Sequence, residues 1–172
     1  MAPADGRSMT AGEAGGDDPR LVSLRDGRQS PAALDICRGV VRLLASHGLA
    51  SVAELPLPNG RRADVVGLSD SGGIWIVEIK SSIEDLRADG KWPEYRDYSD
   101  QLFFAVRPDF PLSALPEDTG LILADRYGGE IIRPSQEARL SGARRKSMML
   151  RFARAAALRL TALADPEMMS SG

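Results

Sequence analysis

The stretch RRADVVGLSDSGGIWIVEIKSS, residues 61–82, sets charged residues into two runs that are otherwise typical of buried β-strands. RRADVVGL and IWIVEIKSS are rich in β-branched and aromatic residues, and the SDSGG segment between them is a cluster of turn-forming residues. The pattern predicts an antiparallel β-hairpin. With its turn centred on Ser71, residues equally distant from Ser71 lie opposite each other, so Asp64 faces Glu78.

Asp64 and Glu78 are therefore a predicted pair of facing carboxylates. Their Cβ atoms are expected to lie about 4.5–5.5 Å apart, where two carboxylates repel each other unless a proton or a cation lies between them. Mg²⁺ and Mn²⁺ prefer oxygen ligands of this kind. Because side chains alternate between the faces of a strand, Lys80 shares a face with Glu78, beside the predicted metal. The opposite face is predicted to pack against a helix through Trp75, Val77 and Ile79.

Two carboxylates with an adjacent lysine suit phosphodiester hydrolysis. A metal ion polarises the phosphate and lowers the pKa of a bound water, and the lysine orients that water. Other common hydrolase and nucleotide-triphosphatase patterns are absent from the sequence, which has no Gly-x-Ser-x-Gly motif, no cysteine pair and no phosphate-binding glycine-rich loop. The single cysteine, Cys37, is predicted to be a core residue, and the single histidine, His47, a helix cap.

Length and composition predict one domain. A chain of 172 residues with 43% hydrophobic content can bury one substantial core, which we place at residues 29–164. A formal net charge of −2 argues against a wholly electrostatic nucleic-acid binder. Residues 1–28 lack the apolar surface needed to offset chain entropy and are expected to form a disordered leader, and residues 165–172 a flexible tail.

The cellular location expected from these features is the cytoplasm. A lone cysteine gives no disulfide framework, so a reducing compartment is the simplest one. The N-terminal segment has no apolar h-region, and no run approaches the roughly 20 apolar residues that span a bilayer. Neither secretion nor a membrane partner is expected.

The order of predicted elements defines the fold class. A helix begins at the N-cap Ser30 and ends at Gly48, and the first strand, ASVAELPL, precedes the hairpin. SIEDLRADG and WPEYRDYSD are read as short helical segments, and the crossover they form lets the strand QLFFAV enter the sheet in parallel. GLILAD and GEIIRP form a further hairpin before a terminal helix at about 141–164. We predict an α/β domain with a central mixed sheet, an antiparallel meander plus a parallel strand, flanked by helices.

At this point the sequence resembles a known group. Asp64, a spacer and Glu78-Ile79-Lys80 match the D…ExK signature of the PD-(D/E)xK, or restriction endonuclease-like, nuclease superfamily, although Ala63 stands where the naming proline would be. The longer run from RRADVVGL through QLFFAV to PEDTGLILAD resembles the MmcB family of bacterial DNA repair proteins, over about residues 31–160. The resemblance implies a metal-dependent, DNA-directed role in repair with Mg²⁺ or Mn²⁺ as cofactor. It implies Asp64 and Glu78 as metal ligands, the Ile79 backbone carbonyl as a third, and Lys80 as the catalytic lysine.

Three residues near the hairpin are further candidates. A two-residue turn at Asn59-Gly60 would send Glu54 to the face away from Asp64, whereas a three-residue turn would place it opposite Asp64 as an added metal ligand or acid. Arg61 and Arg62 precede the site, where they would contact a phosphate or simply be solvated.

Two later segments are candidate DNA contacts. In KWPEYRDY, Lys91 and Tyr95 would grip a backbone and stack on bases, or Tyr95 and Trp92 would pack as core, and the same region carries negative charge from Asp85, Asp89, Glu94, Asp97 and Asp100. The terminal helix has basic residues and no acidic one. Its predicted docking stripe is Met149, Phe152, Ala156, Leu160 and Leu163, and its outward arginines, solvated or bound to DNA phosphates, are Arg144, Arg151 and Arg154.

Three function hypotheses follow. The first is a DNA repair nuclease, endonuclease or exonuclease, acting on damaged, branched or single-stranded DNA, and the second is a non-cleaving module that recognises DNA structure and recruits other repair proteins. The third is a scaffold whose charged strand residues form a surface ion pair. The sequence leaves the oligomeric state open.

Overall fold

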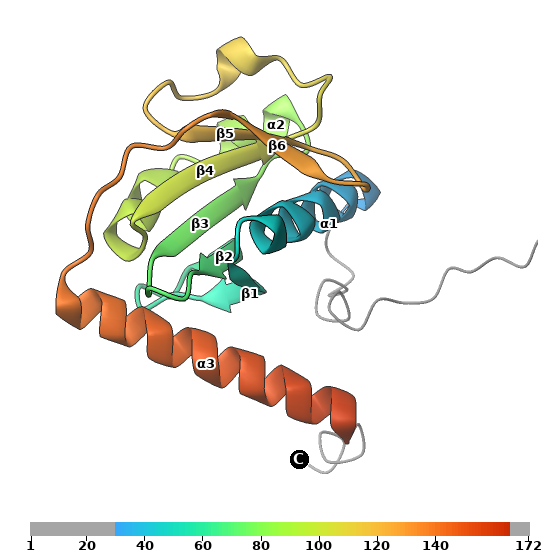
Figure 1. Cartoon of the computed structure of the whole chain (residues 1–172). Helices are drawn as coiled ribbons and strands as arrows, with labels where there is room; N and C mark the ends of the chain where they lie inside the picture. Colours follow the sequence, from blue (N-terminus) through green and yellow to red (C-terminus); the bar gives the residue numbers. More distant parts are fainter. Residues whose placement is uncertain (1–29, 166–172) are drawn as a thin grey trace, which may run out of the picture.

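The computed structural model describes residues 30–165, so the leader predicted for residues 1–28 and nearly all of the predicted tail lie outside the described residues (Figure 1). The six strands form one mixed sheet in the order β1-β2-β3-β4-β5-β6. This confirms the predicted α/β fold class. The elements are α1 (Pro31–Ser46), β1 (Ala50–Pro56), β2 (Arg62–Leu68), β3 (Ile74–Ile79), α2 (Ile83–Ala88), η2 (Trp92–Tyr98), β4 (Gln101–Val106), η3 (Leu112–Ala114), β5 (Gly120–Ala124), β6 (Gly129–Arg133) and α3 (Gly142–Ala164).

The sheet changes from antiparallel to parallel pairing at β3. β1, β2 and β3 form the predicted antiparallel meander, and β4 joins β3 in parallel, as the long crossover predicted. β5 pairs with β4 in parallel and with β6 in the predicted antiparallel hairpin. The parallel pairing of β5 was not predicted, because the link through η3 gives no periodic signal.

Helix α1 covers one face of the sheet. Its N-cap is Ser30, whose Oγ accepts a hydrogen bond from Ala33 N at 3.1 Å, and Pro31 follows at the first helical position. The helix ends as predicted before Gly48, whose φ of 74° favours glycine. Its apolar side packs on the face of β3 that carries Val77 and Ile79, as predicted.

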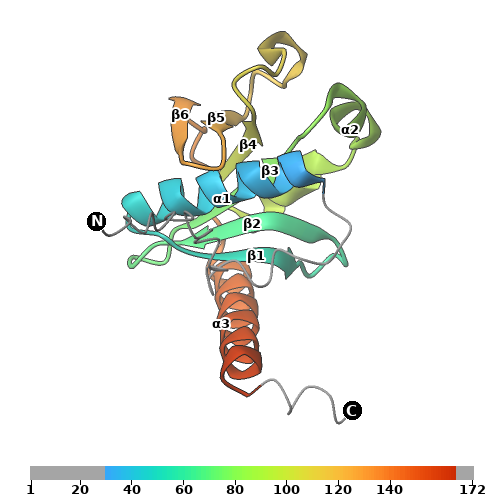
Figure 2. The ribbon, with the colours of Figure 1, turned by 90° about the vertical axis from the view of Figure 1, so that its right-hand side faces the viewer.

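The other face is covered by η2 and α3, so that the two long helices lie on opposite sides of the sheet (Figure 2). Tyr95 is buried in this second core, and Trp92 stacks edge-on against Phe104 with ring centroids 5.5 Å apart. Packing is therefore the observed role of both aromatic rings.

The predicted docking stripe of α3 is correct only in part. Met148 and Phe152 are buried, whereas Met149, Leu160 and Leu163 are exposed, Leu160 by 68%. The apolar packing of α3 begins one residue earlier than predicted, at Met148. The far half of α3 passes the edge strand β1 (Figure 1). Among the described residues no strand lies beyond β1, so Leu160 and Leu163 have no sheet to pack on. Among the described residues, no helix is long and apolar enough to cross a membrane.

Asp100 fixes the start of α3 to the sheet. Its carboxylate is 6% exposed and accepts hydrogen bonds from the backbone amides of Ile74 and Leu140, at 2.8 and 3.0 Å. Arg145 on α3 donates to both oxygens at 2.7 Å and also to Gly72 O. Asp100 and its partner Arg145 thus connect the β2–β3 turn, β3, the segment between β6 and α3, and α3 itself.

Replacing Asp100 with alanine should lower the free energy of unfolding by about 2–4 kcal/mol, because Arg145 and two amides lose their acceptor. Asp97 pairs with Arg144 at 2.8 Å, but both side chains are more than half exposed. The matched control Asp97→Ala should therefore change the free energy by less than about 1 kcal/mol. Urea denaturation measures both, and equal losses would show that Asp100 is no anchor.

Candidate active site

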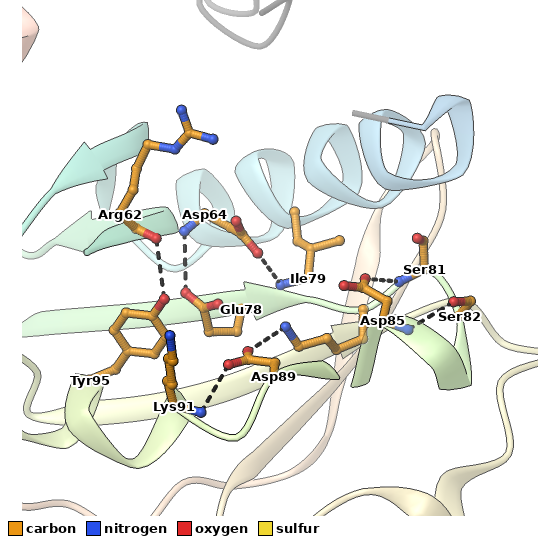
Figure 3. A network of polar contacts seen from close by, with 11 residues as sticks. Arg62, Asp64, Glu78, Ile79, Ser81, Ser82, Asp85, Asp89, Lys91 and Tyr95 are labelled. Carbon is orange, nitrogen blue, oxygen red and sulfur yellow. Dashed lines mark hydrogen bonds and ion pairs between the residues drawn. The ribbon is translucent and has the colours of Figure 1, made fainter. Parts of the chain in front are cut away.

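The candidate site is centred where the backbone pairing between β2 and β3 ends. Four pairs from Leu68–Ile74 to Val65–Val77 follow the register predicted from the turn. The next positions are Asp64 and Glu78, and here the side chains make the hydrogen bonds. Asp64 N donates to Glu78 Oε1 at 3.3 Å, and Ile79 N donates to Asp64 Oδ2 at 2.7 Å (Figure 3).

Both carboxyl groups have raised pKa values. Burial, opposed in part by the Ile79 amide and by Lys80, raises the pKa of Asp64 to about 6. For Glu78, which is 3% exposed, burial and then the charge of Asp64 raise the pKa well above the usual value. The pair therefore resists holding two negative charges without a cation, as the sequence predicted.

Lys80 lies in the same cleft and is 5% exposed. Its backbone amide donates to Ala105 O on β4 at 3.0 Å, and its Nζ donates to Asp89 Oδ2 at 2.6 Å. Burial by itself would lower the pKa of Lys80, but the hydrogen bond to Asp89 and the charges of Glu78, Asp89 and Asp64 raise it. The side chain is thus held as an ammonium.

Asp89 is a site residue that sequence reasoning missed. From the sequence, Asp89 is noted only as one of the acidic residues that give the region around Trp92–Tyr98 a negative charge. The available signal is its place just before Gly90, at the end of a short helix that begins three residues after Lys80. The sequence predicts this short helix, but it does not predict that the end of the helix brings Asp89 back to Lys80.

These residues line a cleft of about 430 Å³. It opens at the carboxyl end of β3, between the start of α1, β2 and the segment from α2 to η2 (Figure 3). Four carboxylates and two cations face it, together with one phenol. The lining residues are Ser30, Ala33, Arg62, Asp64, Glu78, Ile79, Lys80, Ser81, Asp85, Asp89 and Tyr95.

Glu54 lies opposite Asp64 in the strand register. Leu57 N donates to Arg61 O at 2.7 Å, so the loop between β1 and β2 has three residues, the longer of the two turns considered. Glu54 interrupts the ladder with a φ of 51°, a conformation that costs energy for a residue other than glycine. Its buried carboxylate forms an ion pair with Arg62, and its charge contributes to the raised pKa of Asp64.

The other predicted DNA contacts are dispersed. Arg61 forms a bidentate pair with Glu94, and Tyr95 donates its hydroxyl to Arg62 O at 3.3 Å. Lys91 has an exposed side chain at the rim, and its backbone amide donates to Asp89 Oδ1. On α3, Arg144 pairs with Asp97, whereas Arg151 and Arg154 are exposed and form no ion pair with the described residues. The structure brings together Asp64, Glu78, Ile79, Lys80, Arg62 and Tyr95, and places the α3 arginines elsewhere.

The donor groups fit a hard divalent cation. Within residues 30–165 no group of three or more His, Cys, Asp or Glu side chains could hold a metal, so Glu54 does not complete a carboxylate triad. Two carboxylates remain, and in an extended strand the carbonyl of Ile79 is expected on the same side as its amide, which donates to Asp64 Oδ2. Mg²⁺ commonly takes one or two carboxylates and keeps several waters, so this set is sufficient for it.

The fold and the cleft define an α/β domain in which the half-buried Asp64 carboxylate meets the buried Glu78 and Lys80 side chains at the end of a central strand. The model of the MmcB-like family, described as DNA repair protein MmcB-like, matches residues 20–167. The chain therefore belongs to this family of DNA repair proteins, as the resemblance implied. A solved structure, the SPO1766 protein of unknown function from Silicibacter pomeroyi, is 45% identical over 81% of this chain and 95% of that chain, with a TM-score of 0.77. No curated protein matches.

Repulsion between the Asp64 and Glu78 carboxylates should make the free energy of unfolding fall as pH rises. Asp64 binds a proton more tightly in the folded chain than in the unfolded chain. The protonated side chain therefore makes its full contribution to the free energy of unfolding below the ordinary pKa of 3.8, and this contribution is lost as pH rises past about 6. At pH 8 without metal, Asp64→Asn or Glu78→Gln should stabilise the domain by roughly 1–3 kcal/mol, because each amide keeps an acceptor oxygen.

Thermal and urea unfolding in EDTA at pH 5 and pH 8 measure this effect. Asp109→Asn is the control, because Asp109 is 75% exposed and lies outside the cleft. Destabilisation by both cleft variants at pH 8 would mean that the carboxylates are stabilising ion-pair partners instead.

Proposed function

We propose that this chain is a nuclease of the restriction endonuclease-like, PD-(D/E)xK type, which hydrolyses DNA phosphodiester bonds with Mg²⁺ or Mn²⁺. One observation carries the proposal: Asp64, Glu78 and Lys80 meet in one cleft, with both carboxyl groups in a state that favours a cation. Membership in a DNA repair family supports DNA as the substrate.

The roles of the residues follow from their contacts. The metal would be held by Asp64, Glu78 and the Ile79 carbonyl. It would polarise the phosphate and lower the pKa of a bound water. Lys80 carries a charge fixed inside the cleft, where it would orient the attacking water and balance charge on the phosphate. Arg62, 48% exposed at the cleft, is the residue placed to meet an incoming phosphate.

The alternative is a module that recognises DNA structure and recruits repair partners without cutting. It is favoured by the position of α3, which contributes no residue to the cleft yet carries cations and no acidic side chain. DNA bound on α3 alone would leave the cleft unused.

Cleavage of labelled single-stranded, duplex, flapped, forked and crosslinked DNA with Mg²⁺ or Mn²⁺ distinguishes the two functions. We expect Glu78→Ala and Lys80→Ala to abolish cutting while the fold and most DNA affinity are kept, because both residues serve the chemical step. Binding without metal-dependent cutting by the wild-type protein would support the recognition module. Loss of the fold in either variant would make these residues structural.

The α3 arginines should contribute to DNA affinity by contacting phosphates. Arg151→Gln with Arg154→Gln should weaken duplex binding and reduce the slope of log K against log salt by roughly 0.9 for each phosphate that is no longer neutralised. Fluorescence anisotropy from low to moderate salt measures this slope. Arg107→Gln with Arg126→Gln is the control, because it removes the same charge from exposed positions outside α3. Equal effects of the two pairs would show that only net charge matters.

A further inference from the structure

The contact between Lys80 and Asp89 differs from the surface ion pairs of this domain. Lys80 Nζ lies 2.6 Å from Asp89 Oδ2, and the two side chains are only 6% and 19% exposed. In the pair of Arg107 and Asp109, by contrast, the side chains are 52% and 75% exposed. A short, charge-assisted hydrogen bond that is largely shielded from water holds its partners far more firmly than a solvated pair.

Asp89 is itself held in place to receive the ammonium. It caps the end of α2, and its backbone amide donates to Leu86 O at 3.3 Å. Its second carboxylate oxygen, Oδ1, accepts the amide of Lys91 at 3.1 Å. One oxygen thus fixes the carboxylate to its own turn through Lys91 (Figure 3). The other oxygen accepts the hydrogen bond from Lys80 Nζ.

Without Asp89 the ammonium would have other acceptors. Lysine has a long, flexible side chain, and the carboxylates of Asp64 and Glu78 line the same cleft. Both already interact electrostatically with Lys80. An ammonium bound directly to those carboxylates would offset one of their two negative charges and occupy oxygens that a metal needs.

We infer that Asp89 is a positioning residue, which holds the Lys80 ammonium inside the cleft but off the two metal-binding carboxylates. The inference rests on the proposed function in taking Asp64 and Glu78 as metal ligands. Asp89 keeps the cation close enough to serve the phosphate and leaves the carboxylate oxygens open.

Metal affinity tests this role without reference to cleavage. Calorimetry with Mn²⁺ should show affinity weaker by roughly 10–100-fold in Asp89→Ala, a range typical for groups that orient the ligands of a metal site. Adding Lys80→Met to Asp89→Ala should restore the affinity, because the competing ammonium is gone. A merely structural Asp89 would give no such rescue. Asp89→Asn, which keeps one acceptor oxygen, should fall between wild type and Asp89→Ala, and it replaces Asp89→Ala if that variant does not fold.

Asp85 provides the matched control. It lies on the same helix and lines the same cleft, but its carboxylate accepts the amide of Ser81 at 3.2 Å. Asp85→Ala should therefore leave Lys80 in place. Unchanged Mn²⁺ affinity in Asp89→Ala, or equal losses in Asp85→Ala and Asp89→Ala, would overturn the inference.

A second measurement separates this inference from the proposed function. The side-chain carboxyl ¹³C NMR signals of Asp64 and Glu78, recorded in metal-free protein at fixed pH, should shift in Asp89→Ala, because the ammonium then binds these carboxylates, and should stay near their wild-type positions in Asp85→Ala. If wild type binds no Mn²⁺, the proposed metal-dependent function fails, and these signals alone decide whether Asp89 holds Lys80 off the carboxylates. Unchanged signals in Asp89→Ala would then overturn the inference as well.

Discussion

The rest of the site depends on two carboxylates, the half-buried Asp64 and the buried Glu78, which lie where β2 and β3 part. Each accepts a backbone amide that the strand ladder would otherwise have paired, so Asp64 and Glu78 replace a stretch of sheet with side chains. The exchange satisfies the amides, but it brings two acids together away from water. Without a proton or a cation between them, their repulsion therefore lowers the free energy of unfolding.

The change from antiparallel to parallel pairing at β3 explains why the remaining groups gather at this point. A hairpin brings β2 alongside β3, but a parallel neighbour requires the chain to leave the end of β3 and return to the start of β4. The segment that makes this crossover begins at Lys80 and passes through α2 and η2. It therefore delivers Asp85, Asp89 and Tyr95 to the cleft beside the carboxylates. The topology thus places a lysine, its partner and the carboxylates around one strand end.

Local chemistry made much of the fold and the centre of the site predictable. The Ser71 turn fixes the register that sets Asp64 opposite Glu78, and the Ser30 cap and Gly48 fix the bounds of α1. What could not be predicted depends on long-range direction. The pairing of Asp89 with Lys80 and of Arg61 with Glu94 is set by how the crossover folds back, which spacing along the chain does not reveal. The exposed end of α3 was missed for the same reason, since helical periodicity says which residues share a face but not where the sheet ends.

The distribution of charge bears on how a polyanion would approach. Near the cleft, Arg61 and Arg62 are each engaged by a glutamate, so a phosphate arriving there must displace a carboxylate. The cleft itself holds more acidic than basic side chains, so bringing a phosphate in is unfavourable until a cation neutralises the carboxylate pair. On α3, Arg144 is engaged by Asp97, whereas Arg151 and Arg154 form no ion pair with the described residues. Under the proposed function, binding on α3 and entry into the cleft would therefore be separable events, the first governed by salt and the second by the metal.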